Sequence, residues 1–513
     1  MIKFHVTPTY TSIDSASKEE ISAIRNMLSF KDPEYHRKKR FCKFASDEIK
    51  FFTYNKFPTG LLLRVLNSLD EEDIKYKLKI LFKFRKPKFS PEEVLSDSEN
   101  RPYQIKCVKR ALSYGRGYFL IATAGGKTEV ARLIISCLGL KTLYLVHLKE
   151  LLSQTRSLFA NKMGLQEDDI GVIGDNKIIL RNIVIATPQT LSKIMFIPSP
   201  KDIHDKYEIQ RHRQKKKRAR PVLDWIKNVK VFFIDECHHT SAESFYKIAM
   251  NIDAPYRFAM SGTPITGDIK KDLRLIGSTG ECIYEKKTNS LKKEGYISDA
   301  IVKFIKINYV EDKEYGHEIN LKLKFPQRQL GNFLSEEAYQ KQVNKEYRLI
   351  YEDGIVNNLH RNKTIAILRI KHMDKKALIL VDRIDHLDEL SKILDDRGVS
   401  HTCLTGSSSS ETRKKAIEDF DSGEVKTILT TIFKEGANLP DIELLIIAAG
   451  GKSTIVTKQR IGRGLRKGKS SEKLLIYDFY DDIHRYLCHH SEKRMATIRS
   501  DGFLVSFVSM ENH

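Results

Sequence analysis

Phe119-Leu-Ile-Ala-Thr-Ala-Gly-Gly-Lys-Thr128, followed by Glu129-Val-Ala-Arg-Leu-Ile-Ile135, is the stretch that decides the fold. Its first four residues form a short apolar run, as a strand buried on both faces of a parallel sheet requires. The glycines then predict a turn, and the run from Glu129 predicts a helix. Such a helix presents backbone N–H groups and the positive end of its dipole at its N-terminus. The strand, turn and helix together are typical of a loop that binds phosphate.

The turn is therefore predicted to bind ATP with magnesium. Backbone N–H groups of Ala124 to Gly126 would cradle the phosphates, Lys127 would reach the β and γ phosphates, and Thr128 would hold the metal. The full GxxxxGK[ST] pattern has a glycine where this chain has Ile121, so the match is relaxed. A similar turn can also be a loop without a ligand, so the prediction depends on further motifs.

A second motif follows another apolar run. Asp235-Glu-Cys-His238 comes directly after Val231-Phe-Phe-Ile234, which places its carboxylates at the carboxyl edge of a parallel sheet, where ligands bind. Asp235 is predicted to take magnesium, partly through its water shell, and Glu236 to orient and deprotonate the attacking water. Ordinary surface acids at a strand end are the alternative, and the strand context argues against it.

A third motif, Gln459-Arg-Ile-Gly-Arg-Gly-Leu-Arg466, lies far along the chain. The transition state of phosphoryl transfer spreads negative charge, which an arginine from a second domain can stabilise when the domains close. Arg463 and Arg466 are the predicted arginine fingers. Alone, the segment would also fit a solvated basic helix, but its distance in sequence from Lys127 favours the catalytic role.

The overall pattern from about residue 100 onward alternates short β-branched runs with helical stretches, which predicts an α/β fold with two tandem parallel sheets. The strands predicted for the first sheet are Phe119–Ala122, Thr142–Val146, Ile183–Ala186 and Val231–Ile234. Those predicted for the second sheet are Ala377–Val381, Thr427–Thr431 and Leu444–Ala448. The first 95 residues differ, with short strands such as Ile49–Tyr54 and an amphipathic helix at Lys18–Leu28, and predict a small α+β domain.

The charge balance favours a polyanionic partner. The chain carries 88 Lys and Arg against 66 Asp and Glu, a net charge of +22, which fits nucleic acid, although a merely basic surface is the alternative. The strongly basic segment 198–221 repels itself and is predicted to be a mobile loop. It would be either solvated or in contact with DNA phosphates.

The remaining composition indicates a reducing cytoplasm. The seven cysteines are odd in number and never form a CxxC pair, so neither a disulfide framework nor a zinc site is indicated. Zinc at His238 and His239 is not expected, because adjacent strand residues point to opposite faces. No stretch approaches about 20 apolar residues and no signal peptide is evident, so no membrane segment is expected.

Four segments, in this order along the chain, resemble motifs I, II, III and VI of the superfamily-two helicases: Gly125-Gly-Lys-Thr128, Asp235-Glu-Cys-His238, Ser261-Gly-Thr-Pro264 and Gln459–Arg466. The resemblance covers residues 100–480 and implies two RecA-like domains with ATP in the cleft between them. It also implies that Gln104 contacts the adenine and that Gly436 and Gln459 lie near the nucleotide.

Other segments resemble the helicase motifs that grip one nucleic-acid strand. Val146–Gln154 is similar to motif Ia, Ala186–Thr190 to motif Ic and Thr430–Pro440 to motif V. His147 and Leu148 stand where Pro-Thr is usual, and Asn438 where Asp is common, which changes individual contacts but not their placement. The DNA contacts that these likenesses imply are Lys149, Gln154, Thr187, Gln189, Thr405 and Thr430.

A narrower likeness concerns the first domain. Leu28-Ser-Phe30 and Phe52–Leu62 resemble the N-terminal domain of the phage UvsW-type branch-migration helicases. This likeness implies that the domain binds a duplex or a junction, with fork reversal, Holliday-junction migration and strand annealing as activities. Arg37–Arg40 would contact phosphates, or would be a plain surface cluster.

The expected protein is thus an ATP-dependent DNA helicase that remodels branched DNA in replication, recombination and repair. Its expected domains are a DNA-binding domain at residues 1–95 and RecA-like domains at 96–305 and 306–513, the last with a C-terminal helical segment. The alternatives are the duplex-translocating motor of a restriction-type system, an RNA helicase, because backbone grips do not read the sugar, and a binding scaffold with a dead ATPase. The intact motif residues argue against the last: Lys127, Asp235, Glu236, Arg463 and Arg466.

Overall fold

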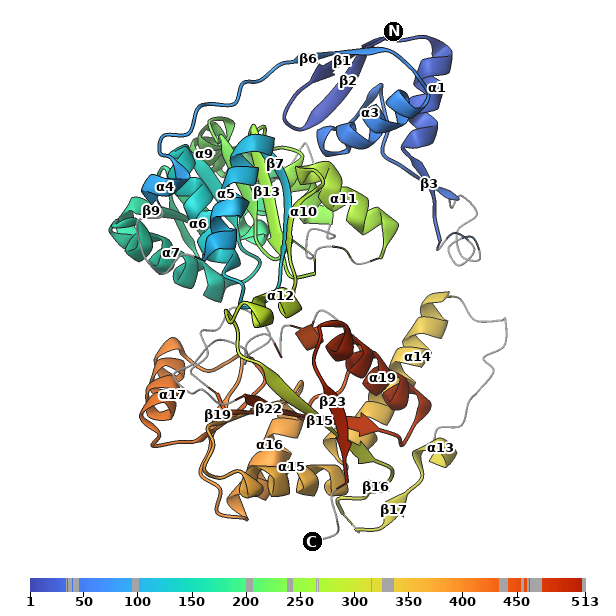
Figure 1. Cartoon of the computed structure of the whole chain (residues 1–513), viewed down its shortest axis with the longest axis vertical. Coiled ribbons are helices and arrows are strands. Elements are labelled where there is room, and N and C mark those ends of the chain that lie inside the picture. The colour runs from blue at the N-terminus through green and yellow to red at the C-terminus, as the bar shows by residue number, and fades with distance from the viewer. Residues whose placement is uncertain are drawn as a thin grey trace. The chain divides into compact units, whose positions relative to one another are not determined.

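The computed structural model describes residues 1–33, 35, 39, 46–94, 101–199, 206–237, 243–263, 265, 267–314, 316–324, 336–432, 442–453, 456–458, 461 and 473–509. The chain divides into two compact units (Figure 1). Unit 1 contains residues 1–122 and 126–286, and unit 2 contains residues 123–125 and 287–513. Among the described helices, none combines the length and apolar character needed to cross a membrane.

An eight-stranded sheet lies at the centre of unit 1, in the order β10-β9-β11-β8-β12-β13-β7-β14. Neighbouring strands are parallel, apart from the antiparallel pair of β9 and β10. The strands are β7 (Arg116–Ile121), β8 (Thr142–Leu145), β9 (Ile170–Gly174), β10 (Lys177–Ile179), β11 (Ile183–Ala186), β12 (Val231–Ile234), β13 (Tyr256–Ser261) and β14 (Cys282–Lys286). The four strands predicted for the first sheet are confirmed as β7, β8, β11 and β12.

Helices cover both faces of this sheet, as Figure 1 shows, with α5, α6 and α7 on one side and α10 and α11 on the other. Every residue of β8, β11 and β12 is buried, which explains why these strands read as continuous apolar runs. The helices are α4 (Pro91–Val94), α5 (Pro102–Tyr114), α6 (Lys127–Leu138), α7 (Lys149–Met163), α8 (Pro188–Met195), α9 (Lys206–Lys227), α10 (Glu243–Ala249) and α11 (Ile269–Thr279), with the 3-10 turn η2 (Glu167–Asp169).

The N-terminal part of unit 1 is a four-stranded sheet in the order β5-β2-β1-β6 with two helices. Its elements are β1 (Ile2–Val6), β2 (Tyr10–Ser15), α1 (Lys18–Met27), β5 (Lys56–Pro58), the 3-10 turn η1 (Thr59–Leu61), α3 (Leu62–Glu71) and β6 (Tyr76–Ile80), beside a hairpin of β3 (Ser29–Lys31) and β4 (Glu48–Lys50). The predicted helix from Lys18 is confirmed. Ser17 and Glu20 cap it reciprocally, since each side chain accepts from the other residue's backbone N–H.

This N-terminal sheet is fastened to the large sheet of unit 1, and the two share one cluster of buried apolar residues. At Gly60 an added Cβ would lie 1.8 Å from the carbonyl oxygen of Ile276, so η1 and α11 can approach this closely only because residue 60 is glycine. The Arg64 guanidinium donates to both carboxylate oxygens of Glu281, through its Nε and Nη2 atoms. Arg116 donates to the carbonyl oxygens of Thr279 and Pro8, at 2.7 and 3.1 Å, and so bridges the two parts.

Unit 2 contains a seven-stranded parallel sheet in the order β19-β20-β18-β21-β22-β15-β23. The strands are β15 (Ala300–Ile307), β18 (Ala377–Leu380), β19 (Thr402–Leu404), β20 (Thr427–Thr430), β21 (Leu444–Ile447), β22 (Leu474–Asp481) and β23 (Val505–Val508). The three strands predicted for the second sheet are confirmed as β18, β20 and β21. The predicted α/β fold class with two RecA-like parallel sheets is therefore confirmed.

The helices of unit 2 are α12 (Thr288–Lys293), α13 (Leu321–Lys324), α14 (Glu336–Tyr351), α15 (Leu359–Lys371), α16 (Ile384–Asp395), α17 (Ser410–Ser422) and α19 (Arg485–Ser500), with the π-helical turn η4 (Glu352–Val356). A short hairpin is formed by β16 (Val310–Glu311) and β17 (Glu318–Ile319). Because β15 pairs with β22, residues from Ala300 onward belong to the second sheet, whereas the predicted division put residues up to 305 in the first motor domain. The three-domain division itself stays a prediction.

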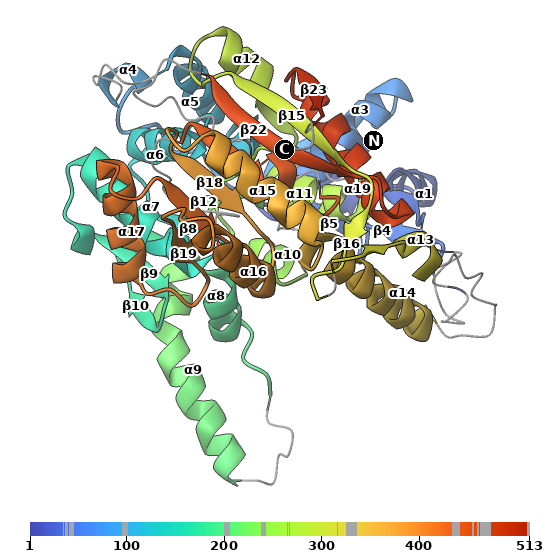
Figure 2. The same ribbon diagram turned by 90° about the horizontal axis from the view of Figure 1, so that it is seen from below.

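The prediction of a mobile loop at residues 198–221 is wrong from Lys206 onward, because these residues form the first part of α9. Lys, Arg, Gln and Ala are good helix formers, and this preference outweighs the repulsion between the charges. The C-terminal part of α9 is also anchored: Val222 and Ile226 are buried, and the Trp225 indole donates to the Arg181 carbonyl oxygen at 2.8 Å. Figure 2 shows α9 extending away from the rest of unit 1.

Replacing Gly60 with alanine should loosen the N-terminal sheet. The added methyl group would collide with the backbone of α11, which cannot rotate away, and overpacking of this kind costs about 1–3 kcal/mol or more. We expect thermal unfolding at a lower temperature and faster proteolysis after β6. The matched control is Gly406→Ala, where the nearest neighbour of an added Cβ would be a methyl group of Ile432 at an ordinary 3.9 Å. Equal stability of both variants would contradict this interface.

Candidate active site

The loop between β7 and α6 has the backbone of a phosphate cradle. Gly126 precedes the first residue of α6 with a φ of +75°, and Ala124 also has a positive φ, of 63°. An added Cβ on Gly126 would lie 2.8 Å from Nε2 of Gln104, so glycine is favoured at this position by conformation and by space. Because the N-cap residue is a glycine, it has no side chain that could cap the first backbone N–H groups of the helix.

Motifs I, II and III meet at the carboxyl edge of the sheet. Lys127 Nζ donates to Glu236 Oε1 at 2.6 Å, and both side chains are largely buried, with 11% and 18% of their surface exposed. The Ser261 hydroxyl, at the end of β13, donates to Glu236 Oε2 at 3.4 Å. Glu236 has a positive φ of 44°, a conformation that is uncommon for a residue other than glycine. The structure thus brings together three segments that lie far apart in the sequence.

The charges in this cluster influence one another. Burial and then the charge of Glu236 raise the pKa of Asp235, although Lys127 opposes the change. Burial alone would lower the pKa of Lys127, but the charges of Glu236 and Asp235 outweigh it and raise that pKa. Lys127 is therefore held in its charged form, and Asp235 shares its site with a second acid. A bound cation would relieve the repulsion between the two acids.

The cluster fits magnesium and a phosphate chain. Asp235, at the end of β12, and Thr128, in the first turn of α6, supply the oxygen ligands that magnesium prefers. The cradle at Gly126 would be filled by a Cβ. The buried hydroxyl of Tyr144 has no hydrogen-bond partner among the described residues. Burial and then the charge of Asp235 raise the pKa of Tyr144 well above its usual range.

The predicted adenine-reading residue lies beside the phosphate loop. Gln104 is buried in the first turn of α5, and its Oε1 accepts a hydrogen bond from the Arg101 backbone N–H at 2.9 Å. Its Nε2 faces Gly126. The position next to the cradle is suitable for a nucleotide contact, and the adenine contact itself stays a prediction.

The predicted DNA contacts of unit 1 follow the carboxyl ends of β8 and β11. Lys149 is the exposed first residue of α7, and Gln154 is exposed one turn later. Thr187 is buried before α8, where its hydroxyl donates to Thr190 Oγ1 at 3.1 Å. Gln189 is exposed, and its amide donates to the His147 carbonyl oxygen at 3.4 Å. These residues form a row at one edge of the sheet.

In unit 2, Thr405 and Thr430 lie at the carboxyl ends of the neighbouring strands β19 and β20. The Thr430 hydroxyl is buried and donates to the Leu404 carbonyl oxygen at 2.8 Å, so a bound strand could use its hydroxyl oxygen as an acceptor at most. Several predicted residues lie outside the described part of the chain, and the structure does not test them: Arg37, Lys38, Arg40, His238, Pro264, Gly436, Asn438, Gln459, Arg463 and Arg466.

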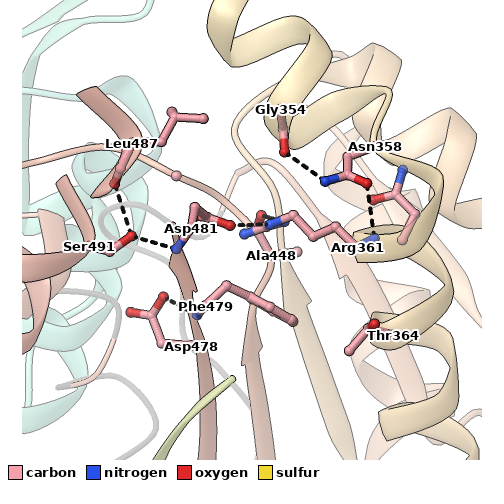
Figure 3. Close-up of polar contacts among 12 residues, drawn as sticks. Gly354, Asn358, Arg361, Thr364, Ala448, Asp478, Phe479, Asp481, Leu487 and Ser491 are labelled. Atoms are coloured by element: carbon pink, nitrogen blue, oxygen red, sulfur yellow. Dashed lines mark hydrogen bonds and ion pairs between the residues drawn. The ribbon is translucent and has the colours of Figure 1, made fainter. Parts of the chain in front are cut away.

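Unit 2 contains a buried charge network that the sequence did not indicate, and Figure 3 shows its part around Arg361 and Asp481. Arg361 of α15 donates to Asp481 at 2.8 Å and to the Ala448 carbonyl oxygen at 2.6 Å. Arg494 of α19 donates to Asp478 at 3.1 Å and to the Gly451 carbonyl oxygen at 2.9 Å. The network fixes the end of β21, from which the chain runs to Val456–Lys458 and on to the predicted arginine fingers. Two aspartates within the otherwise apolar and aromatic strand β22 are the signal that could have revealed it.

Two family profiles match the chain. The family described as "Type III restriction enzyme, res subunit" matches residues 97–266, and the "Helicase conserved C-terminal domain" matches residues 360–468. The chain is 26% identical over 394 residues to the "DNA 3'-5' translocase XPB2" of Sulfurisphaera tokodaii, which covers 74% of this chain and 81% of that protein. It is 24% identical over 264 residues to the "ATP-dependent DNA helicase uvsW" of Enterobacteria phage T4, covering 50% and 47%.

The fold is also similar to a solved structure, the fragment of a putative HsdR subunit of a type I restriction enzyme from Vibrio vulnificus. The TM-score is 0.54 at 16% sequence identity, over 83% of this chain and 72% of that one. At this identity the likeness concerns the fold alone. This similarity in fold agrees with the two parallel sheets of units 1 and 2.

Replacing Arg494 with methionine should destabilise unit 2 strongly. The change would leave Asp478 and Asp481 buried with one cation fewer, and breaking such a pair costs about 3–5 kcal/mol. We expect a large loss in the free energy of unfolding, measured with urea. Arg485→Met, at an exposed position of the same helix, should change it by about 0.5 kcal/mol or less. Similar losses in both variants would contradict the network.

Proposed function

Because the chain is an ATP-dependent DNA helicase of superfamily two, we propose that it acts on branched DNA, reversing forks and migrating Holliday junctions in replication, recombination and repair. The observation that carries the proposal is the N-terminal sheet fastened to the first motor sheet through Gly60 and the Arg64–Glu281 pair. An element held rigidly beside a motor can grip one duplex arm while the motor moves along a strand. The similarity to the phage uvsW helicase supports the DNA helicase activity on which this role depends. The reducing cytoplasm, of a host cell if the gene is carried by a phage, is the proposed location.

In the proposed cycle, ATP binding breaks the ion pair between Lys127 and Glu236. Lys127 turns to the β and γ phosphates, and its departure leaves Glu236 as an acceptor for the proton of the attacking water. The Ser261 hydroxyl keeps Glu236 in place, because it already donates to the other carboxylate oxygen. Thr128 and Asp235 would hold magnesium, which supplies neutralising charge at the transferred phosphoryl group.

Hydrolysis is coupled to movement through contacts with the strand backbone. We assign one grip to the exposed Lys149, Gln154 and Gln189 in unit 1, and the other to Thr405 in unit 2, next to the buried Thr430. Such contacts position a strand without reading its sequence. Arg463 and Arg466 would complete the ATP site from the second motor domain, so that hydrolysis requires closure and each cycle moves one grip relative to the other.

Helix α9 is the proposed contact to duplex DNA. Three consecutive exposed lysines, Lys215, Lys216 and Lys217, lie in this helix together with further cations. The helix extends from the body of unit 1 (Figure 2). Clustered cations on an exposed helix gain affinity by releasing counterions from phosphates. The cost of keeping these charges close together is recovered when they bind a polyanion.

A restriction-type duplex translocase is the second candidate function, and a specific observation favours it. Residues 97–266 match the family described as the res subunit of type III restriction enzymes. Such a motor would hydrolyse ATP on linear duplex DNA without exchanging strands. The two candidates therefore differ in substrate structure and product, and they share the same ATP site.

The deciding experiment compares matched forks, Holliday junctions, linear DNA duplexes and RNA duplexes, with ATP and magnesium. We expect branch migration and unwinding on the branched DNA, and a decrease of at least about 100-fold in Glu236→Gln, because a positioned general base contributes about 10²–10⁴-fold. Lys177→Met, an exposed cation on the edge strand β10, is the control and should retain full activity. ATP hydrolysis on linear duplex without strand exchange would replace this proposal with the translocase.

A second prediction concerns α9. Replacing Lys215, Lys216 and Lys217 with alanine keeps a strong helix former at each position but removes three charges. We expect weaker duplex binding, with the slope of log K against log salt reduced by about 0.9 for each phosphate that is no longer neutralised. The matched control replaces the same lysines with arginine and should retain the native slope. An unchanged slope in the alanine variant would remove α9 from the DNA-binding surface.

A further inference from the structure

Tyr144 is a polar residue in an unexpected place. It lies in β8, a central strand of the parallel sheet in unit 1, where every position is buried and apolar residues are typical. Its ring packs against Phe159 of α7 and Phe233 of β12, with ring centroids 5.3 and 5.8 Å apart. A phenylalanine would fill this space equally well, so packing alone does not account for the hydroxyl.

The strand register directs this hydroxyl toward the ATP site. Tyr144 pairs with Phe233 in the neighbouring strand β12, so the two side chains lie on the same face of the sheet. Asp235 follows Phe233 by two residues and therefore emerges on that face as well. The Asp235 carboxylate and the Thr128 hydroxyl are both close enough to the Tyr144 hydroxyl to influence its pKa. These are the two groups assigned to magnesium.

The hydroxyl is fully buried; Asp235 and Thr128 lie near enough to interact with it, but no group among the described residues meets the distance and angle of a hydrogen bond. A buried hydroxyl without a partner costs free energy, since it has given up its bond to water. Tyr256, in β13 two strands away, shows the usual arrangement, because its hydroxyl donates to the Arg85 carbonyl oxygen at 2.7 Å. The Tyr144 hydroxyl therefore lacks a hydrogen bond of the kind that the Tyr256 hydroxyl makes, and it lies where the nucleotide is proposed to bind.

We propose that Tyr144 is a positioning residue of the nucleotide site, whose hydroxyl donates to the Asp235 carboxylate and accepts from the Thr128 hydroxyl once magnesium and nucleotide are bound. It thereby fixes the orientation of the two groups that hold the cation. Outer partners of this kind orient the direct ligands of a metal, and their loss costs about 10- to 100-fold in metal affinity. The inference rests on the proposed function, because it requires magnesium and nucleotide at this site.

The test is thermal unfolding of the full chain, first without ligand and then with ADP and increasing Mg²⁺. Tyr144→Phe removes the hydroxyl and keeps the ring, so the variant without ligand should unfold at the native temperature or above it. The Mg²⁺ concentration that gives half of the stabilisation by ADP should rise at least about 10-fold. A Mg²⁺ titration of ATP hydrolysis should shift in the same direction.

Tyr256→Phe is the matched control. It removes a hydrogen bond that the structure contains, so it should unfold at a lower temperature without ligand and keep the native Mg²⁺ dependence. Native Mg²⁺ dependence in Tyr144→Phe would overturn the inference, as would a decrease in stability without ligand equal to that of Tyr256→Phe. If the native chain itself gains no stability from Mg²⁺ and ADP, the proposed ATP site fails, which is a distinct result.

Discussion

The ion pair between Lys127 and Glu236 is the interaction on which the candidate ATP site depends. It joins the first residue of α6 to the second residue after β12 at 2.6 Å, in a cluster that also contains the buried Asp235. Two acids and one cation at the edge of a sheet leave a surplus of negative charge. The arrangement is stable without ligand because Lys127 balances one acid, and it is ready for a cation because the other acid remains.

The remaining structure holds this edge in place. Strands β8 and β12 are buried along their whole length, on both faces of the sheet. The residues that follow the carboxyl ends of these strands therefore have little freedom to move. The Arg64–Glu281 pair and Gly60 fasten the N-terminal sheet to the same scaffold. In unit 2, the buried network of Arg361 and Arg494 holds the end of β21 in the same manner. Both units therefore combine an apolar sheet with a few buried charges at the edge where chemistry is proposed.

The sequence predicted the parts of this structure that depend on local pattern. Continuous apolar runs identified seven strands, and the capping residues Ser17 and Glu20 agree with the predicted first helix. The first part of α9 was predicted as a loop because its charges repel, although the helix preference of its residues is a local property that outweighs this repulsion. Prediction failed where tertiary contacts decide, since the buried Trp225 and Ile226 that anchor α9 could not be recognised as buried. The pairing of Arg494 with Asp478, and the approach of Tyr144 to Asp235, depend on residues brought together by the fold. No spacing rule in the sequence predicts them.

The most direct test of the proposed ATP site is a crystal structure of the chain with magnesium and a non-hydrolysable ATP analogue. We predict that Lys127 Nζ has left Glu236 and contacts the phosphates, while Glu236 faces a water near the terminal phosphate. Asp235 and Thr128 should face the metal. An intact Lys127–Glu236 pair, with the nucleotide bound elsewhere, would contradict the proposed site.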